Sequence, residues 1–555
     1  MTFGRAVIAV VLVLGGSPVF AAPEVRSLPA TPLAAEIAER LAGPGDVPGD
    51  VVVAERTLDG GSLRTLYESR NYSPLWLADG ALTADARSLV DLFGRAKGEG
   101  LEPHDYYVAE LAGPLASTSA AEAELLMSAA VMRFATDIQA GRFDPGRLGE
   151  DVDYERKDVP GPAFALIAAA SPEPARYLTG LAPDSPAYDD LRGILAEYRA
   201  LAAAGGWPAV PDGPTLEPGD IDGAQTIALR RRLAVTGEYV STLVGPPAPA
   251  YDPALVEAVQ RFQSRHGLET DGVVGPRTRR ALNVTAEQRI DQIVATMERW
   301  RWLPDDLGDR FIMVNLPGYQ LRIVDEGRPV RDMDVIVGLA DRQTPLFSSR
   351  LTWLEFNPTW TMPTSIAIKD YLPKLLDDPT YLRSHGFRMF AGWHNDAAEI
   401  EAAYLDWEAI GEGIKYFRIR QEPGPSNALG KVKFMMANSF SVYLHDTPSR
   451  GLFSRSRRAF SSGCVRVQDP IWLADYLLSD TARWTGSFRA EVMGGWETTR
   501  INLDNPMPVH LAYWTAFRGD DGRINFREDI YGLDSATQTV LAEVRPNSAQ
   551  IALLD

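Results

Sequence analysis

The sequence predicts a multidomain α+β protein. A helical N-terminal scaffold and a small three-helix module precede a β-rich domain that carries a helical insertion. Three observations support this fold class: the chain has 555 residues, which exceeds a single domain, apolar residues recur at helical spacing over residues 24–216, and β-branched runs dominate after residue 308. Runs of helices followed by runs of strands are typical of α+β organisation or of separate domains.

The first 21 residues have the pattern of a secretory signal peptide. Arg5 precedes an apolar run from Ala6 to Leu14, and small residues place the cleavage site after Ala21. The run is shorter than the about 20 apolar residues that a membrane span needs, so we expect no membrane span. An uncleaved N-terminal anchor is the alternative. The mature chain is therefore expected outside the cytoplasm.

Residues 24–216 are expected to form the helical scaffold. Thr83 can cap a helix whose apolar positions, beginning at Ala86, follow i, i+3, i+4, i+7 spacing. No catalytic signature falls in this range, so packed helices account for it best. The net charge of the chain is −19, which disfavours a nucleic-acid partner.

Residues 220–284 are expected to form the small three-helix module. The helical pattern that begins near Pro253 ends in HGLETDG, where an Asp-Gly pair breaks it. Gly275-Pro276 then opens another helix with proline at its first position. The preceding segment IDGAQTIALRRRLAVTG supplies the remaining helix.

Residues 308–500 are expected to form the β-rich domain. FIMVNLPGYQLRIVDEGRPVRDMDVIVGL contains β-branched runs separated by Pro-Gly and Glu-Gly turns, which indicates successive antiparallel strands. Helical patterns such as IAIKDYLPKLL interrupt the strands over residues 365–431, so we expect an insertion there. Residues 501–555 are expected to be a C-terminal extension.

Cys464 is the only cysteine of the chain, and an exported protein usually pairs its cysteines. A lone thiol there is either a buried small apolar residue or is kept for its chemistry. A thiol becomes a good nucleophile when a neighbouring histidine takes its proton. His445, at the end of an alternating strand, is the best-placed histidine, and Ser462 and Gly463 supply a turn whose N–H groups can stabilise an oxyanion. We expect no metal and no cofactor, because no metal-ligand pattern is present.

These residues carry a specific resemblance. The pattern His, then Ser-x-Gly-Cys-x-Arg resembles the YkuD-type catalytic domain of L,D-transpeptidases. The matching residues are His445, Ser461, Gly463, Cys464 and Arg466. FNPTWTMPTSIAIKDYLPK, EPGPSNALGKVKF, YLHDTPSRGLF and HLAYWTAF are similar to the large YcbB-like group, which has an N-terminal scaffold, a peptidoglycan-binding module and a helical capping insertion.

The module resembles the peptidoglycan-binding module. The matching residues are Phe262, Gln263, Gly267, Leu268, Asp271, Gly272, Val274, Gly275, Thr278, Ala281 and Leu282. Such modules bind the wall or serve as spacers. The resemblance is therefore specific for the fold of the module and less so for its function.

The resemblance implies the substrate, peptidoglycan stem peptides and glycan in the periplasm. Cys464 would form a thioester with the third stem residue, and an amine of a neighbouring stem would resolve it into a 3→3 crosslink, with His445 moving the protons. A carbapenem would acylate the same thiol. Arg466 would hold stem carboxylates. Tyr443 would orient the site or pack there, and Trp360 would line the cleft or belong to the core.

Other functions remain open at this point. With water as acceptor the same thioester gives an L,D-carboxypeptidase or hydrolase. A non-catalytic wall-binding scaffold is a different class, which the Cys464–His445 pair disfavours. A papain-like protease is disfavoured because the cysteine follows the histidine in the chain. Cell-wall synthesis proteins are candidate partners.

Overall fold

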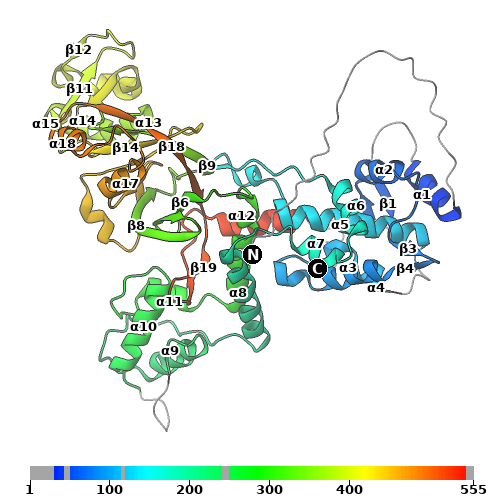
Figure 1. Cartoon of the computed structure of the whole chain (residues 1–555). Coiled ribbons are helices and arrows are strands. Elements are labelled where there is room, and N and C mark those ends of the chain that lie inside the picture. Colours follow the sequence, from blue (N-terminus) through cyan, green and yellow to red (C-terminus); the bar gives the residue numbers. More distant parts are fainter. Residues whose placement is uncertain (1–30, 43–49, 55, 114–118, 241–248, 545–555) are drawn as a thin grey trace, which may run out of the picture.

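The computed structural model describes residues 31–42, 50–54, 56–113, 119–240 and 249–544 (Figure 1). The predicted signal peptide, residues 1–21, lies outside these ranges. Within them, every helix is too short or too polar to cross a membrane. In Figure 1 the scaffold helices lie at the right, the small module at the lower left and the insertion at the upper left.

The helical scaffold is built around the long helix α5 (Ala120–Ala140). Ser119 and Glu122 form a capping box at its start, which satisfies backbone N–H groups that the first turn leaves free. The buried carboxylate of Glu124 accepts hydrogen bonds from the N–H groups of Trp76 and Leu77, both at 3.0 Å. The other helices are α1 (Pro32–Ala42), α2 (Gly60–Glu68), α3 (Ala84–Gly94), α4 (Val108–Ala112), α6 (Gly161–Ala170) and α7 (Pro174–Thr179). Two short hairpins, β1 (Val51–Val53) with β2 (Arg56–Leu58) and β3 (Leu77–Ala78) with β4 (Ala81–Leu82), complete this unit.

Two helices join the scaffold to the β-rich domain. Helix α8 (Pro186–Ala203) packs on α12 (Ala286–Trp302), and both contribute apolar side chains to the core of the β-rich domain. The range expected as one scaffold, residues 24–216, is therefore divided between two cores. The sequence could not separate them, because both parts show the same helical spacing.

The module consists of three helices around its own small core, as the sequence predicted. They are α9 (Gly223–Val235), α10 (Pro253–Arg265) and α11 (Pro276–Leu282). The module is held against the hairpin of β19 (Ala516–Arg518) and β20 (Ile524–Phe526), because Arg265 donates to the carbonyl of Ile524 and Arg527 donates to the carbonyl of Arg265 at 2.7 Å.

The β-rich domain is one ten-stranded sheet in the order β14-β15-β17-β8-β7-β6-β18-β9-β5, with β16 paired to β8. β14 also pairs with β9, so the strands close into a ring around the main core. The strands are β5 (Val152–Asp153), β6 (Arg310–Asn315), β7 (Gln320–Asp325), β8 (Arg328–Gly338), β9 (Leu346–Phe356), β14 (Val432–Met436), β15 (Leu444–His445), β16 (Ala459–Ser461), β17 (Val465–Val467) and β18 (Thr499–Ala512). Helices α17 (Pro470–Leu477) and α18 (Gly486–Gly494) pack against it.

The sheet continues into the segment expected to be a C-terminal extension. Strand β18 runs across residue 500 and lies between β6 and β9. Helix α19 (Leu533–Glu543) follows and packs on α12. The last described part of the chain thus belongs to the main core.

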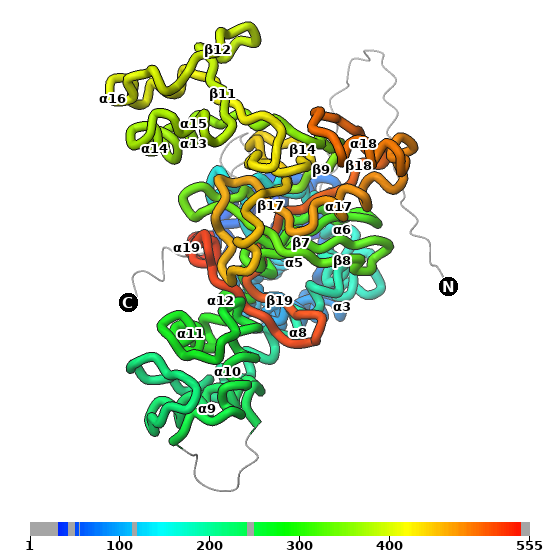
Figure 2. Tube along the Cα trace, turned by 90° about the vertical axis from the view of Figure 1, so that its left-hand side faces the viewer, coloured from blue at the N-terminus to red at the C-terminus, as the bar shows by residue number. Residues whose placement is uncertain are grey.

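The insertion between β9 and β14 is a mixed unit and not a purely helical one. It contains a four-stranded sheet in the order β10-β13-β11-β12, with a separate apolar core. The strands are β10 (Trp360–Thr361), β11 (Phe387–Phe390), β12 (Glu399–Ile400) and β13 (Arg418–Gln421), and the helices are α13 (Thr364–Ile366), the π-helix η5 (Ala367–Tyr371), α14 (Leu372–Asp377), α15 (Tyr381–Ser384) and α16 (Trp407–Ile410). Short strands of four residues or fewer leave little alternation to detect in a sequence. Figure 2 shows the insertion and the module at opposite ends of the molecule.

Candidate active site

His445 is placed by a short, well-defined strand. Strand β15 pairs antiparallel with β14 and parallel with β17, so Lys433, His445 and Arg466 are direct partners across three neighbouring strands. Directly opposed residues of a sheet point to the same face. The sheet therefore groups two cations with the imidazole on one face.

The turn before β15 is fixed by one side chain. Asn438 accepts hydrogen bonds from the N–H groups of Phe440 (3.1 Å) and Val442 (3.0 Å), and donates to the carbonyl of Val442 at 2.8 Å. Such local bonds hold a turn as backbone pairing would. They determine where the strand that carries His445 begins.

The imidazole of His445 is buried, with 5% of the residue exposed. Burial lowers its pKa to about 3, with a further contribution from the charge of Arg466. Nδ1–H donates to the carbonyl of Asp446. Since a carbonyl can only accept, the neutral ring keeps its other nitrogen, Nε2, as a proton acceptor. The histidine is therefore neutral, with Nε2 as its acceptor nitrogen.

The carboxylate of Asp446 fixes the backbone next to His445. It accepts hydrogen bonds from the N–H of Lys431 (2.7 Å), the N–H of Thr447 (2.6 Å) and the guanidinium of Arg450 (2.6 Å). Gly430 has a positive φ of 59°, and a Cβ there would collide with the Asp446 carboxylate at 2.3 Å. These bonds fix the backbone whose carbonyl orients His445.

Cys464 ends the tight turn that joins β16 to β17. Gly463 has a φ of 110°, which side-chain-bearing residues rarely adopt. The hydroxyl of Thr344 donates to the carbonyl of Gly463 at 2.7 Å, and that of Ser461 donates to the carbonyl of Cys464 at 2.5 Å. The turn is thus held from the preceding strand and from the loop after β8.

The half-buried thiol of Cys464 has a pKa above its ordinary value because burial disfavours the thiolate. Hydrogen bonds from Tyr443 and the charges of Lys433 and Arg466 act in the opposite direction and reduce this rise. The ring of Tyr443 packs edge-on against His445, with 5.7 Å between ring centroids, and Lys433 lies over the same ring at 4.1 Å. Tyr443 therefore touches both the thiol and the imidazole.

The remaining residues expected at the site lie in different surroundings. Arg466 lies on the face shared with His445, and its Nε is buried with no hydrogen-bond partner among the described residues. Ser462 is exposed, and the N–H of Gly463 donates to the hydroxyl of Ser461 at 3.3 Å. Trp360 is 8% exposed and belongs to the core of the insertion, where it packs against Tyr371 at 6.4 Å. It reaches the site through that neighbour.

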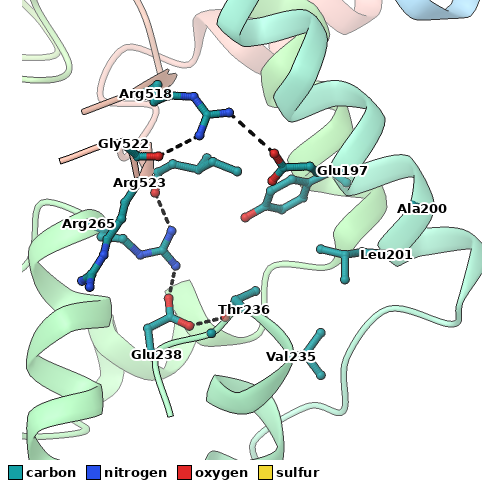
Figure 3. Close-up of a pocket in the computed structure, with 13 residues that line it drawn as sticks. Glu197, Ala200, Leu201, Val235, Thr236, Glu238, Arg265, Arg518, Gly522 and Arg523 are labelled. Atoms are coloured by element: carbon teal, nitrogen blue, oxygen red, sulfur yellow. Dashed lines mark hydrogen bonds and ion pairs between the residues drawn. The ribbon is translucent and has the colours of Figure 1, made fainter. Parts of the chain in front are cut away.

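A cavity of about 720 Å³ lies away from Cys464, between α8, the end of α9 and the β19–β20 hairpin (Figure 3). Four of its charged side chains form two pairs, Arg265 with Glu238 and Arg518 with Glu197 at 3.6 Å. Among the described residues, no group of three or more His, Cys, Asp or Glu side chains is arranged to hold a metal ion.

Three domain families match this chain. Residues 61–195 match a family described as "Scaffold domain", residues 222–282 one described as "Putative peptidoglycan binding domain", and residues 309–495 the L,D-transpeptidase catalytic domain of the YkuD family. This protein carries a YkuD-type L,D-transpeptidase catalytic domain. The resemblance found in the sequence is confirmed, as is the order of helical region, module and β-rich domain.

One curated relative, named "Putative L,D-transpeptidase" from Haemophilus influenzae, is 39% identical over 259 residues. The match covers 46% of this chain, and the chain spans about half the length (51%) of that relative. Two solved L,D-transpeptidase structures are also similar. The structure from Stackebrandtia nassauensis is 14% identical, and the match covers 55% of this chain and 96% of that one, with a TM-score of 0.21. The structure from Xylanimonas cellulosilytica is 16% identical, and the match covers 54% of this chain and 99% of that one, with a TM-score of 0.17. Scores this low carry no argument.

Sequence reasoning did not assign several residues that contact the candidate site. Lys433 lies opposite His445 because of the register in which β14 pairs with β15, and the spacing of residues in the sequence does not show this register. Tyr371, on the insertion, interacts with the charge of Arg466. Asp446 adjoins His445 in the chain, so its position within the motif was the one signal available.

Proposed function

We propose that the protein is an L,D-transpeptidase that forms 3→3 crosslinks between peptidoglycan stem peptides through a Cys464 thioester. The observation that carries the proposal is the parallel pairing of β15 with β17 inside the matched domain. It sets His445, with Nε2 free to accept, beside the strand that begins directly after Cys464. Acyl transfer to cysteine uses a neighbouring base, and this pairing brings the imidazole to the strand that follows Cys464.

In the first half-reaction, the Cys464 sulfur attacks the carbonyl of the third stem residue. The thiol proton passes to His445 Nε2, and the thioester forms as the bond to the terminal D-alanine breaks. His445 then gives its proton to the departing amine. General acid–base help of this kind contributes about 10²–10⁴-fold to the rate.

In the second half-reaction, the side-chain amine of a diaminopimelate on a neighbouring stem attacks the thioester carbonyl. His445 removes a proton from that amine, the carbon–sulfur bond breaks, and the thiol is restored. The product is an amide between two third residues. The donor peptide bond supplies the energy, so the reaction consumes no nucleotide.

Arg466 and Tyr443 are proposed to act on substrate and thiol, respectively. The buried Arg466 Nε with no hydrogen-bond partner among the described residues suits a stem carboxylate. The Tyr443 hydroxyl supports the thiolate as it develops, since its hydrogen bond to Cys464 lowers the thiol pKa. Backbone N–H groups of the turn at Ser462 and Cys464 are the proposed oxyanion donors, while the N–H of Gly463 donates to the Ser461 hydroxyl. Trp360 is proposed to act indirectly, by packing against Tyr371.

The proposed location is the periplasm, where the mature chain has access to the cell wall. The peptidoglycan-binding domain is proposed to hold glycan or stem peptides near the catalytic face, and proteins of cell-wall synthesis are proposed partners. A peptidoglycan-acting enzyme must reach its polymer outside the cytoplasm, which the domain matches support.

Mass spectrometry of purified disaccharide-tetrapeptides incubated with the enzyme tests the proposal. Wild type should yield 3→3 dimers and free D-alanine, and Cys464→Ala should yield neither. Arg455→Gln, in the exposed part of the loop between His445 and Cys464, is the matched control and should retain crosslinking. Tripeptides without dimers would instead establish an L,D-carboxypeptidase, and unchanged substrate would establish a wall-binding scaffold.

A further inference from the structure

Arg342 connects the insertion to the turn that carries the nucleophile. Its Nη1 donates to the Asp370 carboxylate at 2.6 Å and to the Ser462 hydroxyl at 3.0 Å. Asp370 belongs to the insertion and Ser462 lies two residues before Cys464. One nitrogen atom thus contacts two parts of the protein that are about 90 residues apart in the chain.

The loop that carries Arg342 is itself fixed. It joins β8 to β9 and folds back over Gly338, where a Cβ would lie 2.2 Å from the Arg342 carbonyl oxygen. The N–H of Arg342 donates to the carbonyl of Leu339 at 3.0 Å. Thr344 accepts from the N–H of Gly338 at 2.9 Å and donates to the carbonyl of Gly463. The guanidinium therefore extends from a rigid base that also holds the turn.

The insertion presents two neighbouring residues to this region. Asp370 and Tyr371 both lie on the π-helix η5, a rare element that often occurs at functional sites. Asp370 pairs with Arg342, and Tyr371 interacts with the charge of Arg466 on the face of His445. The same short segment is therefore linked through Arg342 to Ser462, before Cys464, and interacts electrostatically with Arg466, after it.

We propose that Arg342 is a positioning residue that holds the nucleophile turn and the insertion in one arrangement, so that Cys464 is correctly placed only while the insertion is docked. The proposal rests on the proposed role of Cys464 as nucleophile. The Nε of Arg342 is buried without a hydrogen-bond partner among the described residues and lies 3.9 Å from the Asp341 carboxylate. The charge-assisted bond to Asp370 and the bond to Ser462, both made by Nη1, give the side chain its positioning role.

The test measures acylation of the full-length protein by imipenem, followed by intact mass, in Arg342→Gln, Arg342→Lys and Asp370→Asn. Misplacing a reacting group by 1 Å lowers a rate by up to about 10²-fold, so we expect Arg342→Gln to lower the limiting acylation rate by roughly 10–100-fold. The half-saturating drug concentration should change little. Arg342→Lys should recover part of the rate, and the double variant with Asp370→Asn should be no slower than Arg342→Gln alone.

Hydrogen exchange supplies a readout that a lost surface ion pair would not change. In Arg342→Gln, exchange should increase both in residues 365–377 and in the turn at 459–467. Arg388→Gln is the matched control, because it breaks an arginine–carboxylate contact with Glu399 within the insertion and should leave rate and exchange at the turn unchanged.

Two results overturn the inference: an Arg342→Gln protein acylated at the wild-type rate, or a slower one whose exchange at the turn is unchanged. Both are distinct from failure of the proposed function. That failure would appear in wild type, as absence of acylation or as equal acylation of Cys464→Ala.

Discussion

At the scale of single residues, the charge states of Cys464 and His445 shape the chemistry. Burial raises the thiol pKa and lowers that of the imidazole to about 3, so both groups are neutral at neutral pH. The pair therefore starts as thiol and imidazole, and proton transfer accompanies attack. A preformed thiolate–imidazolium pair would need the opposite shifts.

A neutral thiol and a neutral imidazole predict how the rate of alkylation of Cys464 by iodoacetamide depends on pH. The rate is measured by intact mass. Because the thiol pKa is raised, the thiolate fraction and hence the rate should rise about tenfold per unit from about pH 5 up to the ordinary thiol pKa. Tyr443→Phe should move the profile to still higher pH, since the lost hydrogen bond lowers the thiol pKa in wild type. A plateau between about pH 5 and 8 would contradict the neutral pair.

A second prediction concerns Asp446. Asp446→Ala leaves three donors, the N–H groups of Lys431 and Thr447 and the guanidinium of Arg450, without their acceptor. Arg450 is exposed and can bond to water, but each of the two backbone donors, if left buried and unsatisfied, costs about 1–3 kcal/mol. Crosslinking should fall further than the unfolding free energy alone explains, because the carbonyl that orients His445 also moves. Asp446→Asn keeps one carbonyl acceptor and should be intermediate in both measurements; equal activity of all three proteins would refute a positioning role.

At the scale of elements, the sequence predicted where strands occur better than it predicted which elements lie beside one another. The glycine turn located Cys464. Alternation predicted a strand over residues 440–444, but the structure has only the two-residue strand β15 there, preceded by the turn that Asn438 holds. Sequence spacing could not place His445 and Cys464 on adjacent parallel strands, because the connection between them runs through β16 and an irregular loop. Contacts between elements, such as Lys433 beside His445 or Arg342 with Asp370, depend on register and on docking of the insertion, neither of which has a local pattern.

Helix α12 illustrates an element whose role appears only in the fold. Glu298 is fully buried and accepts hydrogen bonds from the N–H of Arg142 (2.5 Å) and from Arg301 (2.9 Å), which links the end of α5 to α12. Removing one partner of a buried ion pair costs about 3–5 kcal/mol. Glu298→Ala should therefore lower the thermal midpoint markedly and increase hydrogen exchange in α12, whereas Glu287→Ala, exposed in the first turn of the same helix, should change both only slightly. Similar midpoints for the two variants would show that this network contributes little.

At the scale of the whole molecule, the ten-stranded sheet lies between the module and the insertion (Figures 1 and 2). The module is fixed to the β19–β20 hairpin through Arg265 and Arg527, so it is built into the body of the protein. The insertion is different, because it has its own core and joins the sheet only between β9 and β14. It is the unit best able to move relative to Cys464.

The joint between sheet and insertion allows a clean deletion. Phe356 and Val432 are paired at the ends of β9 and β14, and the N–H of Asn357 donates to the carbonyl of Lys431 at 2.8 Å. Replacing residues 358–430 by a two-residue Asn-Gly turn would therefore bridge the short gap between the two strand ends. The deleted protein should fold, because the core of the insertion is separate from the main core.

We expect this deletion to change the fate of the acyl-enzyme more than its formation. Cys464 should still be acylated by a carbapenem, at a reduced rate because the Asp370 contact is gone. A segment that covers a thioester excludes water, so hydrolysis of the acyl-enzyme should accelerate and transfer to an acceptor stem should fall. The deacylation rate and the dimer yield, compared between the intact and deleted proteins, test whether the insertion covers the thioester. An unchanged ratio of transfer to hydrolysis would mean that the insertion does not act as a lid, and its contacts with Arg342 and Arg466 would then serve positioning alone.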